Sequence, residues 1–288
     1  MTKKLNDFLK VSWFDFDHMT FIPENMTSRT RATFENHLAK MRLIDKHISI
    51  IMNPISSEKQ KEASYIALVK MLHFTHHRDT ENRKSKLDGL TSISTCALVN
   101  HYCMARKLEA MLHPEKDIIC KYCYAITQQR QQIGTMLCGI RNKKILSSVL
   151  IPVEYFKYAD VGEDENQRIE AFGDVDCETQ CRNFIRLVKA WTVKNFAGWS
   201  KNIMIWFSSF EKEGKPINLC FVVSSLIVNV VMPIKECFMK WIDHRFTVFD
   251  HDFAKAHNIK INCGGRKCIK CLLCYRHNTE FDIYELKK

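Results

Sequence analysis

After residue 88, short apolar runs alternate with amphipathic segments of helix length. The runs are apolar almost throughout, which is typical of strands buried on both faces of a sheet. One intervening segment predicts a helix that begins after a cap at Asp176 and has Phe184 and Leu187 on its apolar face. The predicted strands are residues 147–156 (a strand or a strand plus turn), Arg168–Asp174, 195–201, Ile217–Ser225 and Arg245–Asp250.

Strands separated by segments of helix length favour parallel pairing. We therefore expect an α/β fold with a partial or full (β/α) barrel-like parallel sheet. The chain before the sheet is more polar, and a Ser57 cap followed by apolar residues at helical spacing predicts a helix there. The expected organisation is an N-terminal helical region at 1–88, an α/β core at 89–258 and a small Cys-rich segment at 259–288.

The charged stretch His76–Gly89 predicts an exposed linker between the helical region and the core. Three histidines precede or begin it, His73, His76 and His77. No cysteine or carboxylate stands at ligand spacing from them, so we interpret them as a solvated helix end rather than a metal site.

Composition adds a constraint on partners. The chain has 288 residues, 46% of them apolar, and a formal net charge of +11. A basic balance favours anionic partners such as nucleic acid, phosphorylated cofactors or acidic lipid headgroups, although charge for solubility explains it equally well. The most apolar stretch, which starts at Ile217, is interrupted by Asn218 and Asn229, which argues against a membrane span.

Thirteen cysteines stand in a chain whose first residues contain no apolar signal segment. We therefore expect a reducing cytoplasmic location, where clustered cysteines act as metal ligands or catalytic thiols more often than as disulfides.

Polar residues follow three of the predicted strands. In parallel sheets, functional groups gather where the strands end. Gly173 and Asp174, Lys201 and Asn202 after Ser200, and Ser224 and Ser225 all fall at predicted strand ends, which makes them candidate functional residues. Each pair by itself is equally explained by an ordinary turn or cap.

The first group of sulfur ligands is the pair Cys120 and Cys123 in "CKYCYA". Two intervening residues allow both thiols to reach one metal centre. Cys103, farther upstream, is the expected third ligand across a loop, and Cys96 is the less favoured alternative for this position. Three thiolates on a [4Fe–4S] cluster leave one iron open, whereas a zinc ion needs a fourth ligand, for which Cys96 or His101 is available.

The second group is stronger, because "CGGRKCIKCLLCY" contains two overlapping CxxC steps after a Gly-Gly turn. Four thiolates suit a structural zinc ion or a closed [4Fe–4S] cluster, and consecutive CxxC steps favour the cluster. The basic and aromatic neighbours of these thiols keep a zinc knuckle for nucleic acid open. The predicted ligands are Cys263, Cys268, Cys271 and Cys274.

These motifs, taken in order, resemble the gene-product-88 domain family found in phages and bacteria. The resemblance covers about residues 86–286 and implies a phage or mobile-element protein. It rests on "KLDGLTSISTC", Cys103, "ICKYCYA", "RIEAFGDV", "NFAGWSKN", "NLCFVVSS" and "CIKCLLCYRHN".

That family is similar to radical S-adenosylmethionine enzymes, and the resemblance implies roles for the residues. Cys103, Cys120 and Cys123 would hold the cluster, with Tyr122 in the aromatic place of the motif. The four C-terminal cysteines would hold an auxiliary cluster. The strand-end residues Gly173, Asp174, Lys201, Asn202, Ser224 and Ser225 would face S-adenosylmethionine, with Lys201 or Arg141 near its carboxylate.

This sequence departs from the usual motif at one point, because Cys103 lies much farther from Cys120 along the chain than the standard spacing allows.

Two functions follow from the sequence. One is a radical S-adenosylmethionine-type enzyme that acts on an unknown substrate. The other is a non-enzymatic protein with structural zinc that binds nucleic acid through its basic surface.

Overall fold

The computed structural model describes residues 14–15, 20–77, 86–264, 267–277 and 279–287. Its centre is a seven-stranded sheet in the order β3-β4-β5-β6-β7-β8-β9. β3 is antiparallel to β4, and every later pair is parallel. The strands of this sheet are β3 (Phe74–His76), β4 (Thr91–Ile93), β5 (Asn166–Ile169), β6 (Asn195–Ser200), β7 (Leu219–Ser224), β8 (His244–Phe249) and β9 (Asp282–Leu286).

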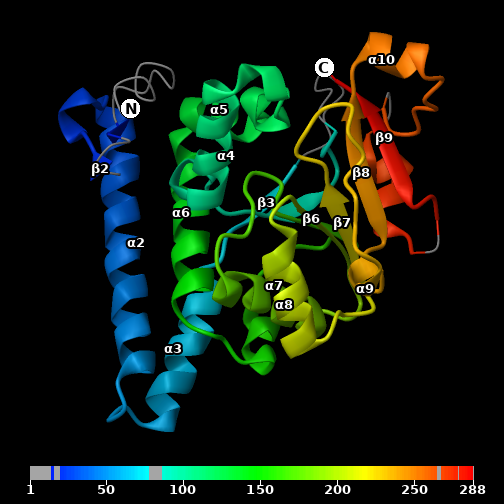
Figure 1. Ribbon diagram of the computed structural model, residues 1–288. Helices are drawn as coiled ribbons and strands as arrows, with labels where there is room; N and C mark the ends of the chain where they lie inside the picture. Colours follow the sequence, from blue (N-terminus) through cyan, green and yellow to red (C-terminus); the bar gives the residue numbers. More distant parts are fainter. Residues whose placement is uncertain (1–13, 16–19, 78–85, 265–266, 278, 288) are drawn as a thin grey trace.

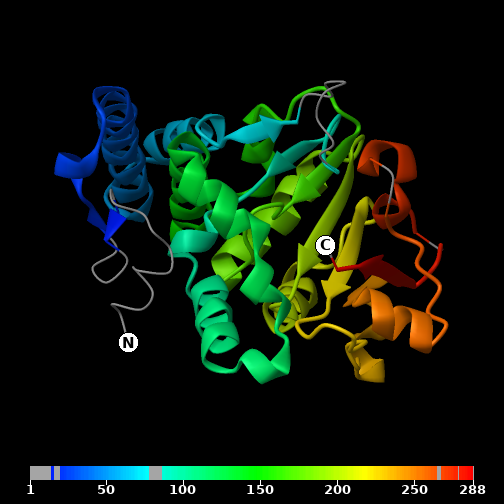
Figure 2. The same ribbon diagram turned by 90° about the horizontal axis from the view of Figure 1, so that it is seen from above.

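The parallel strands follow one another across the sheet in chain order, as the colour sequence in Figure 2 shows. Right-handed connections between such strands place the intervening helices on one face. The α/β prediction is confirmed. The sheet has two edges, β3 and β9, so the described strands do not close into a full barrel.

Helices cover one face of the sheet, which we call the outer face, and the N-terminal helices lie on the side of its β3 edge (Figure 1). None of the described helices is long and apolar enough to cross a bilayer. The longer ones are α2 (Ser28–Met52), α3 (Glu58–Lys70), α4 (His101–Leu112), α5 (Tyr124–Gln131), α6 (Ile133–Ser148), α7 (Glu178–Ala190) and α8 (Ile203–Glu213). The shorter elements are the β1–β2 pair (Phe14–Asp15, Thr20–Phe21), α9 (Glu236–Met239), α10 (His251–Ala256), α11 (Cys268–Cys271) and the 3-10 helices η1 (Pro23–Asn25), η2 (Ala97–Val99), η3 (Pro114–Lys116), η4 (Ile119–Tyr122), η5 (Val153–Tyr158) and η6 (Leu273–Tyr275).

The main core lies between the outer face of the sheet and α6, α7 and α8. Trp206, Phe207 and Phe210 of α8 pack on Phe221 of β7, and all four side chains are buried. Apolar burial of this extent is the main stabilising contribution to the fold. Because these helices occupy the outer face, the opposite face of the sheet, the inner face, is the one available for functional groups.

The N-terminal helices form a hairpin that packs along α6 (Figure 1). A capping box begins α3, in which Ser57 and Gln60 bond each other's backbone N–H groups. After α3 the chain continues into β3, which pairs with β4. The region 1–88 therefore supplies an edge strand of the sheet, and the segment 259–288 supplies the other edge strand, β9.

The prediction of a strand at 147–156 is wrong. α6 continues to Ser148, and η5 follows Pro152. The side chain of Asn183 in α7 accepts a hydrogen bond from the backbone N–H of Ile151 at 2.9 Å and donates to the carbonyl of Val149 at 2.8 Å. A side-chain amide thus replaces the neighbouring strand that this segment would otherwise need.

Two further boundaries differ from the predicted ones. β5 ends at Ile169, because Glu170 adopts a left-handed φ of 55° that a strand cannot accommodate. The cap of α7 is Cys177 rather than Asp176, whose carboxylate instead accepts from the backbone N–H of His101 at 3.3 Å. The strands predicted at 195–201, Ile217–Ser225 and Arg245–Asp250 are confirmed as β6, β7 and β8.

The prediction of a solvated helix end at the three histidines is also wrong. α3 ends at Lys70, and His76 belongs to the edge strand β3, where its Nδ1 lies 2.8 Å from Asp164 Oδ2. His77 Nε2 lies 2.8 Å from the hydroxyl of Ser92 in β4. Most of the predicted linker, residues 78–85, lies outside the described residues.

Asn142 joins the N-terminal region to the core. Its buried side chain accepts from the backbone N–H of His73 at 2.8 Å and donates to the carbonyls of His73 and Ser94 at 2.8 and 2.9 Å. Asn142→Ala should lower the free energy of unfolding by about 2–4 kcal/mol, because three partly buried backbone groups of His73 and Ser94 lose their partner. Urea denaturation measures this, and the surface variant Asn53→Ala serves as control. An equal loss in both variants would contradict the role of Asn142.

Candidate functional site

A cavity of about 570 Å³ opens on the inner face of the sheet, at the carboxyl ends of the parallel strands. The arrowhead of β7 in Figure 1 points toward this end, where α4 and α5 lie. Both cysteine groups line the cavity. Its lining thiols are those of Cys103, Cys120, Cys123, Cys263, Cys268, Cys271 and Cys274.

Cys103 reaches the cavity from the first turn of α4. Asn100 caps this helix and accepts from the backbone N–H of Cys103 at 2.8 Å. Cys120 lies in η4, and Cys123 is the residue at which η4 ends and α5 begins. The residues between Cys103 and Cys120 thus fold as α4, η3 and η4. This path brings Cys120 back to the cavity that Cys103 lines.

Cys103 and Cys120 lie close enough to each other and to Cys123 for the neighbouring thiols to influence their ionisation. Burial raises the pKa of Cys103 well above its usual value, and negative charge at Asp174, Cys123 and Cys120 raises it further. Burial also raises the pKa of Cys120, which the ammonium group of Lys201 opposes. Thiols crowded in this way keep their protons unless a positive centre binds them.

Lys201 supplies the positive charge next to these thiols. Burial lowers the pKa of the ammonium group, but Cys120, Asp174 and Cys123 in their ionised forms raise it by more, so the pKa lies above its usual value. The lysine therefore remains charged at the floor of the cavity. It is suited to bind a carboxylate or another anionic group there.

Asp174 orders the loops around this lysine. Its buried carboxylate accepts from the hydroxyl of Ser200 at 2.6 Å and from the backbone N–H of Lys201 at 2.8 Å. Its backbone carbonyl accepts from the side chain of Asn100 at 2.6 Å. One residue therefore connects the end of β6 to the helix that carries Cys103.

Gly173 is required by a close approach. A Cβ atom there would lie 2.6 Å from Glu170 Oε2 and 2.8 Å from the Thr95 hydroxyl. The Glu170 carboxylate accepts from that hydroxyl at 2.7 Å and from Gln180 Nε2 at 2.8 Å. Gly173 thus admits a buried acid below the cavity, and any side chain would displace it.

The four C-terminal thiols are held by the chain around Lys86 and by β9. The backbone N–H of Cys268 donates to the Lys86 carbonyl at 2.8 Å, and the Lys86 ammonium lies 3.8 Å from Cys263 Sγ. Leu272, between Cys271 and Cys274, has a left-handed φ of 51° that reverses the chain between the two thiols. The segment folds back over the inner face and completes the wall of the cavity opposite α4.

Three buried donors beside this second group have no hydrogen-bond partner among the described residues. They are Arg168 Nε, Trp199 Nε1 and the Tyr275 hydroxyl, and all three residues line the cavity. The Arg168 guanidinium stacks on the Trp199 ring at 4.0 Å. Burial raises the pKa of Cys268 and Cys274, and Arg168 acts in the opposite direction. The wall therefore presents donors and positive charge to a ligand that accepts hydrogen bonds.

The structure brings five of the seven predicted ligand-facing residues to the cavity: Tyr122, Gly173, Asp174, Lys201 and Ser224. The other two residues, Asn202 and Ser225, do not line the cavity and instead form hydrogen bonds within the adjoining loops. Asn202 donates to the Val175 carbonyl at 2.9 Å, and Ser225 donates to the Val230 carbonyl at 2.6 Å.

Three alternative residues from the sequence lie away from the cavity. Arg141 contacts His37 and Cys138, with its guanidinium 3.3 Å from His37 Nδ1. Cys96 is buried 3.5 Å from Gln129 Oε1, and burial raises its pKa to about 12. His101 does not line the cavity either. Of the candidates for the third thiol, Cys103 lines the cavity together with Cys120 and Cys123, and Cys96 does not.

Sequence reasoning missed several cavity residues. Arg168 and Glu170 lie inside the predicted strand Arg168–Asp174. A segment interpreted as a strand gives no reason to single out its charged residues. A charged residue within an apolar run was the available signal. No such signal marks Lys86 and Trp199 in the sequence, because their contacts in the cavity depend on how the C-terminal segment folds.

No protein-family model, curated protein or solved structure matches this chain. The function therefore has to be argued from the chemistry of the cavity.

Glu170 predicts a pH dependence of stability. Burial raises its pKa from 4.5 to about 8. Between these values the unfolded state has released the proton and the folded state retains it, so the free energy of unfolding should fall as pH rises, by an amount on the order of 3 kcal/mol. Denaturation at pH 5, 6, 7 and 8 measures the slope.

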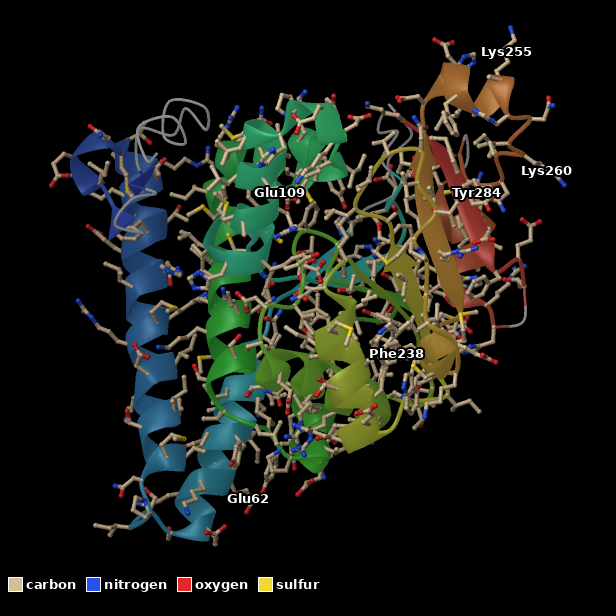
Figure 3. All side chains as sticks on the ribbon, viewed as in Figure 1. Glu62, Glu109, Phe238, Lys255, Lys260 and Tyr284 are labelled. Atoms are coloured by element: carbon tan, nitrogen blue, oxygen red, sulfur yellow. The ribbon has the colours of Figure 1, made fainter. Side chains whose placement is uncertain are left out.

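Glu170→Gln should flatten that slope, because the variant has no proton to release. Glu62→Gln is the matched control, since Glu62 lies on the exposed side of α3 (Figure 3). If Glu170→Gln kept the slope of the control, the buried carboxyl would not be its source.

Proposed function

We propose that this chain is an iron–sulfur enzyme of the radical S-adenosylmethionine type. The observation that carries the proposal is the meeting of Cys103, Cys120 and Cys123 at the carboxyl end of a parallel sheet, beside Lys201 and Asp174. The substrate is unknown. The resemblance to the phage and bacterial gene-product-88 domain family agrees with this proposal.

The spacing of the thiols supports a cluster over a single ion. Among the described residues, only Cys220, Asp243 and His277 form a set of three or more cysteine, histidine or carboxylate ligand atoms within 4.8 Å of one another. A tetrahedral zinc ion holds its sulfur ligands about 4 Å apart. In a cluster each thiolate binds a different iron, so wider spacing fits.

The unpartnered donors support a cluster at the second group as well. Bridging sulfides accept hydrogen bonds and carry negative charge. Arg168 Nε and Trp199 Nε1 lack acceptors among the described residues. A zinc ion offers no acceptor of its own, so it leaves these donors dependent on the thiolates or on another ligand.

When bound, a cluster with one open iron position supplies the electron that starts radical chemistry on S-adenosylmethionine. The chain's own part is to bind, orient and exclude water. Lys201 offers a half-buried cation for a carboxylate, and Asp174 holds its backbone in place. Ser224 and Tyr122 line the space around these groups.

The zinc alternative makes an opposite prediction for the purified protein. Isolation without oxygen should give a brown protein that absorbs at about 400 nm, with about eight iron and eight sulfide per chain when both groups are filled. A colourless protein that contains zinc, and that retains nucleic acid during purification, would replace the proposal with the alternative.

Cys123→Ala tests the assignment of the first group. Iron content should fall to about half of the wild-type value, because one of two clusters is lost. The control is Cys237→Ala, which removes an exposed cysteine and should retain the full content. Wild-type iron content in Cys123→Ala would exclude this ligand set.

Cys271→Ala tests the second group. The described part of residues 259–288 buries few apolar side chains, among them Tyr275 and Ile283, so a bound cluster is expected to organise the segment. The variant should lose about half of its iron and become sensitive to proteases between Cys263 and β9, whereas Cys237→Ala should resist. A variant as resistant as the wild type would show that the segment folds without a metal.

A further inference from the structure

Three side chains with metal-binding atoms meet outside the cavity. They are Cys220, Asp243 and His277, and their ligand atoms all lie within 4.8 Å of one another. His277 Nδ1 lies 2.8 Å from Asp243 Oδ1. None of the three lines the cavity that holds the two cysteine groups. The set is therefore separate from the proposed enzymatic site.

The three residues come from distant parts of the chain. Cys220 is the second residue of β7, Asp243 directly precedes β8, and His277 follows η6 of the Cys-rich segment. The starts of β7 and β8 mark the amino end of the sheet, opposite the cavity. In Figure 3 this end of the sheet lies near the label of Phe238, a residue of α9, the short helix between β7 and β8.

The position of Asp243 leaves one oxygen for a cation. Its Oδ2 accepts from the backbone N–H of Phe221 at 2.6 Å and pairs with the Lys215 ammonium. Its Oδ1 faces His277. Lys215 offsets the carboxylate charge, so a bound divalent ion would be balanced mainly by the Cys220 thiolate and the remaining carboxylate charge.

Burial distinguishes this set from a catalytic triad. Cys220 is 1% exposed within the sheet, which leaves no room for a substrate beside its sulfur. The His277 side chain is 37% exposed, so an ion can enter from that side. One thiolate, one imidazole and one carboxylate are a ligand combination suited to zinc rather than to magnesium or calcium.

We propose that Cys220, Asp243 and His277 bind a zinc ion, with water in the fourth position. The ion would join β7 to the chain before β8 and to the chain after the four C-terminal cysteines. His244 already holds the same segment, since its ring nitrogens lie 2.9 Å from the carbonyls of Glu280 and Arg276. The zinc would thus fasten the Cys-rich segment to the amino end of the sheet.

The test uses the full chain with its iron–sulfur content already reconstituted, so that the seven cavity thiols do not compete for zinc. The protein is incubated with zinc sulfate, desalted over a weak chelator, and analysed for zinc and iron per chain. X-ray absorption at the zinc edge then counts sulfur ligands. His277→Gln and Cys220→Val are compared with the controls His251→Gln and Cys237→Ala, which change exposed residues.

The wild type and both controls should retain one zinc per chain with a single sulfur ligand at about 2.3 Å. His277→Gln and Cys220→Val should lose that zinc without losing iron. His277 is exposed, so its variant is expected to fold even if Cys220→Val does not. Wild-type zinc content in His277→Gln, or zinc bound by three or four sulfurs, would overturn the proposal. The iron result tests the proposed function separately.

Discussion

The buried carboxylate of Asp174 is the contact on which the rest of the site depends. It accepts hydrogen bonds from the Ser200 hydroxyl and the backbone of Lys201, while its carbonyl accepts from Asn100, the cap of α4. A buried charge is retained only where such partners satisfy it. The same residue therefore fixes both the lysine at the floor of the cavity and the helix turn that presents Cys103.

A second constraint is the return of the C-terminal segment over the inner face of the sheet. The Lys86 carbonyl binds the backbone of Cys268, and Lys86 also pairs with Glu285 of β9. These contacts place two cysteine groups on one cavity, although they are far apart in sequence. The cavity is lined by both groups and by the aromatic side chains of Trp199 and Tyr124.

The fold could be predicted to a useful degree from the sequence. Long apolar runs such as Ile217–Ser225 predicted buried parallel strands, and the structure has β7 there. The errors arose where side chains replace backbone partners. Residues 147–156 have the apolar content of a strand, yet Asn183 satisfies their backbone. The histidines before residue 78 follow a stretch with helical spacing, yet α3 ends at Lys70 and pairing with β4 makes His76 part of a strand.

The sequence by itself determined the candidate ligand atoms: the thiols, their CxxC spacings and the polar residues that follow buried strands. Local spacing limits which atoms can share a centre, so these features can be identified without a structure. Only the tertiary structure decided that Cys103 rather than Cys96 lines the cavity with Cys120 and Cys123, and that Arg141 does not reach it. It also gathered Cys220, Asp243 and His277 at one place. Contacts between distant residues are set by the packing of the sheet and its helices, and no local pattern records them.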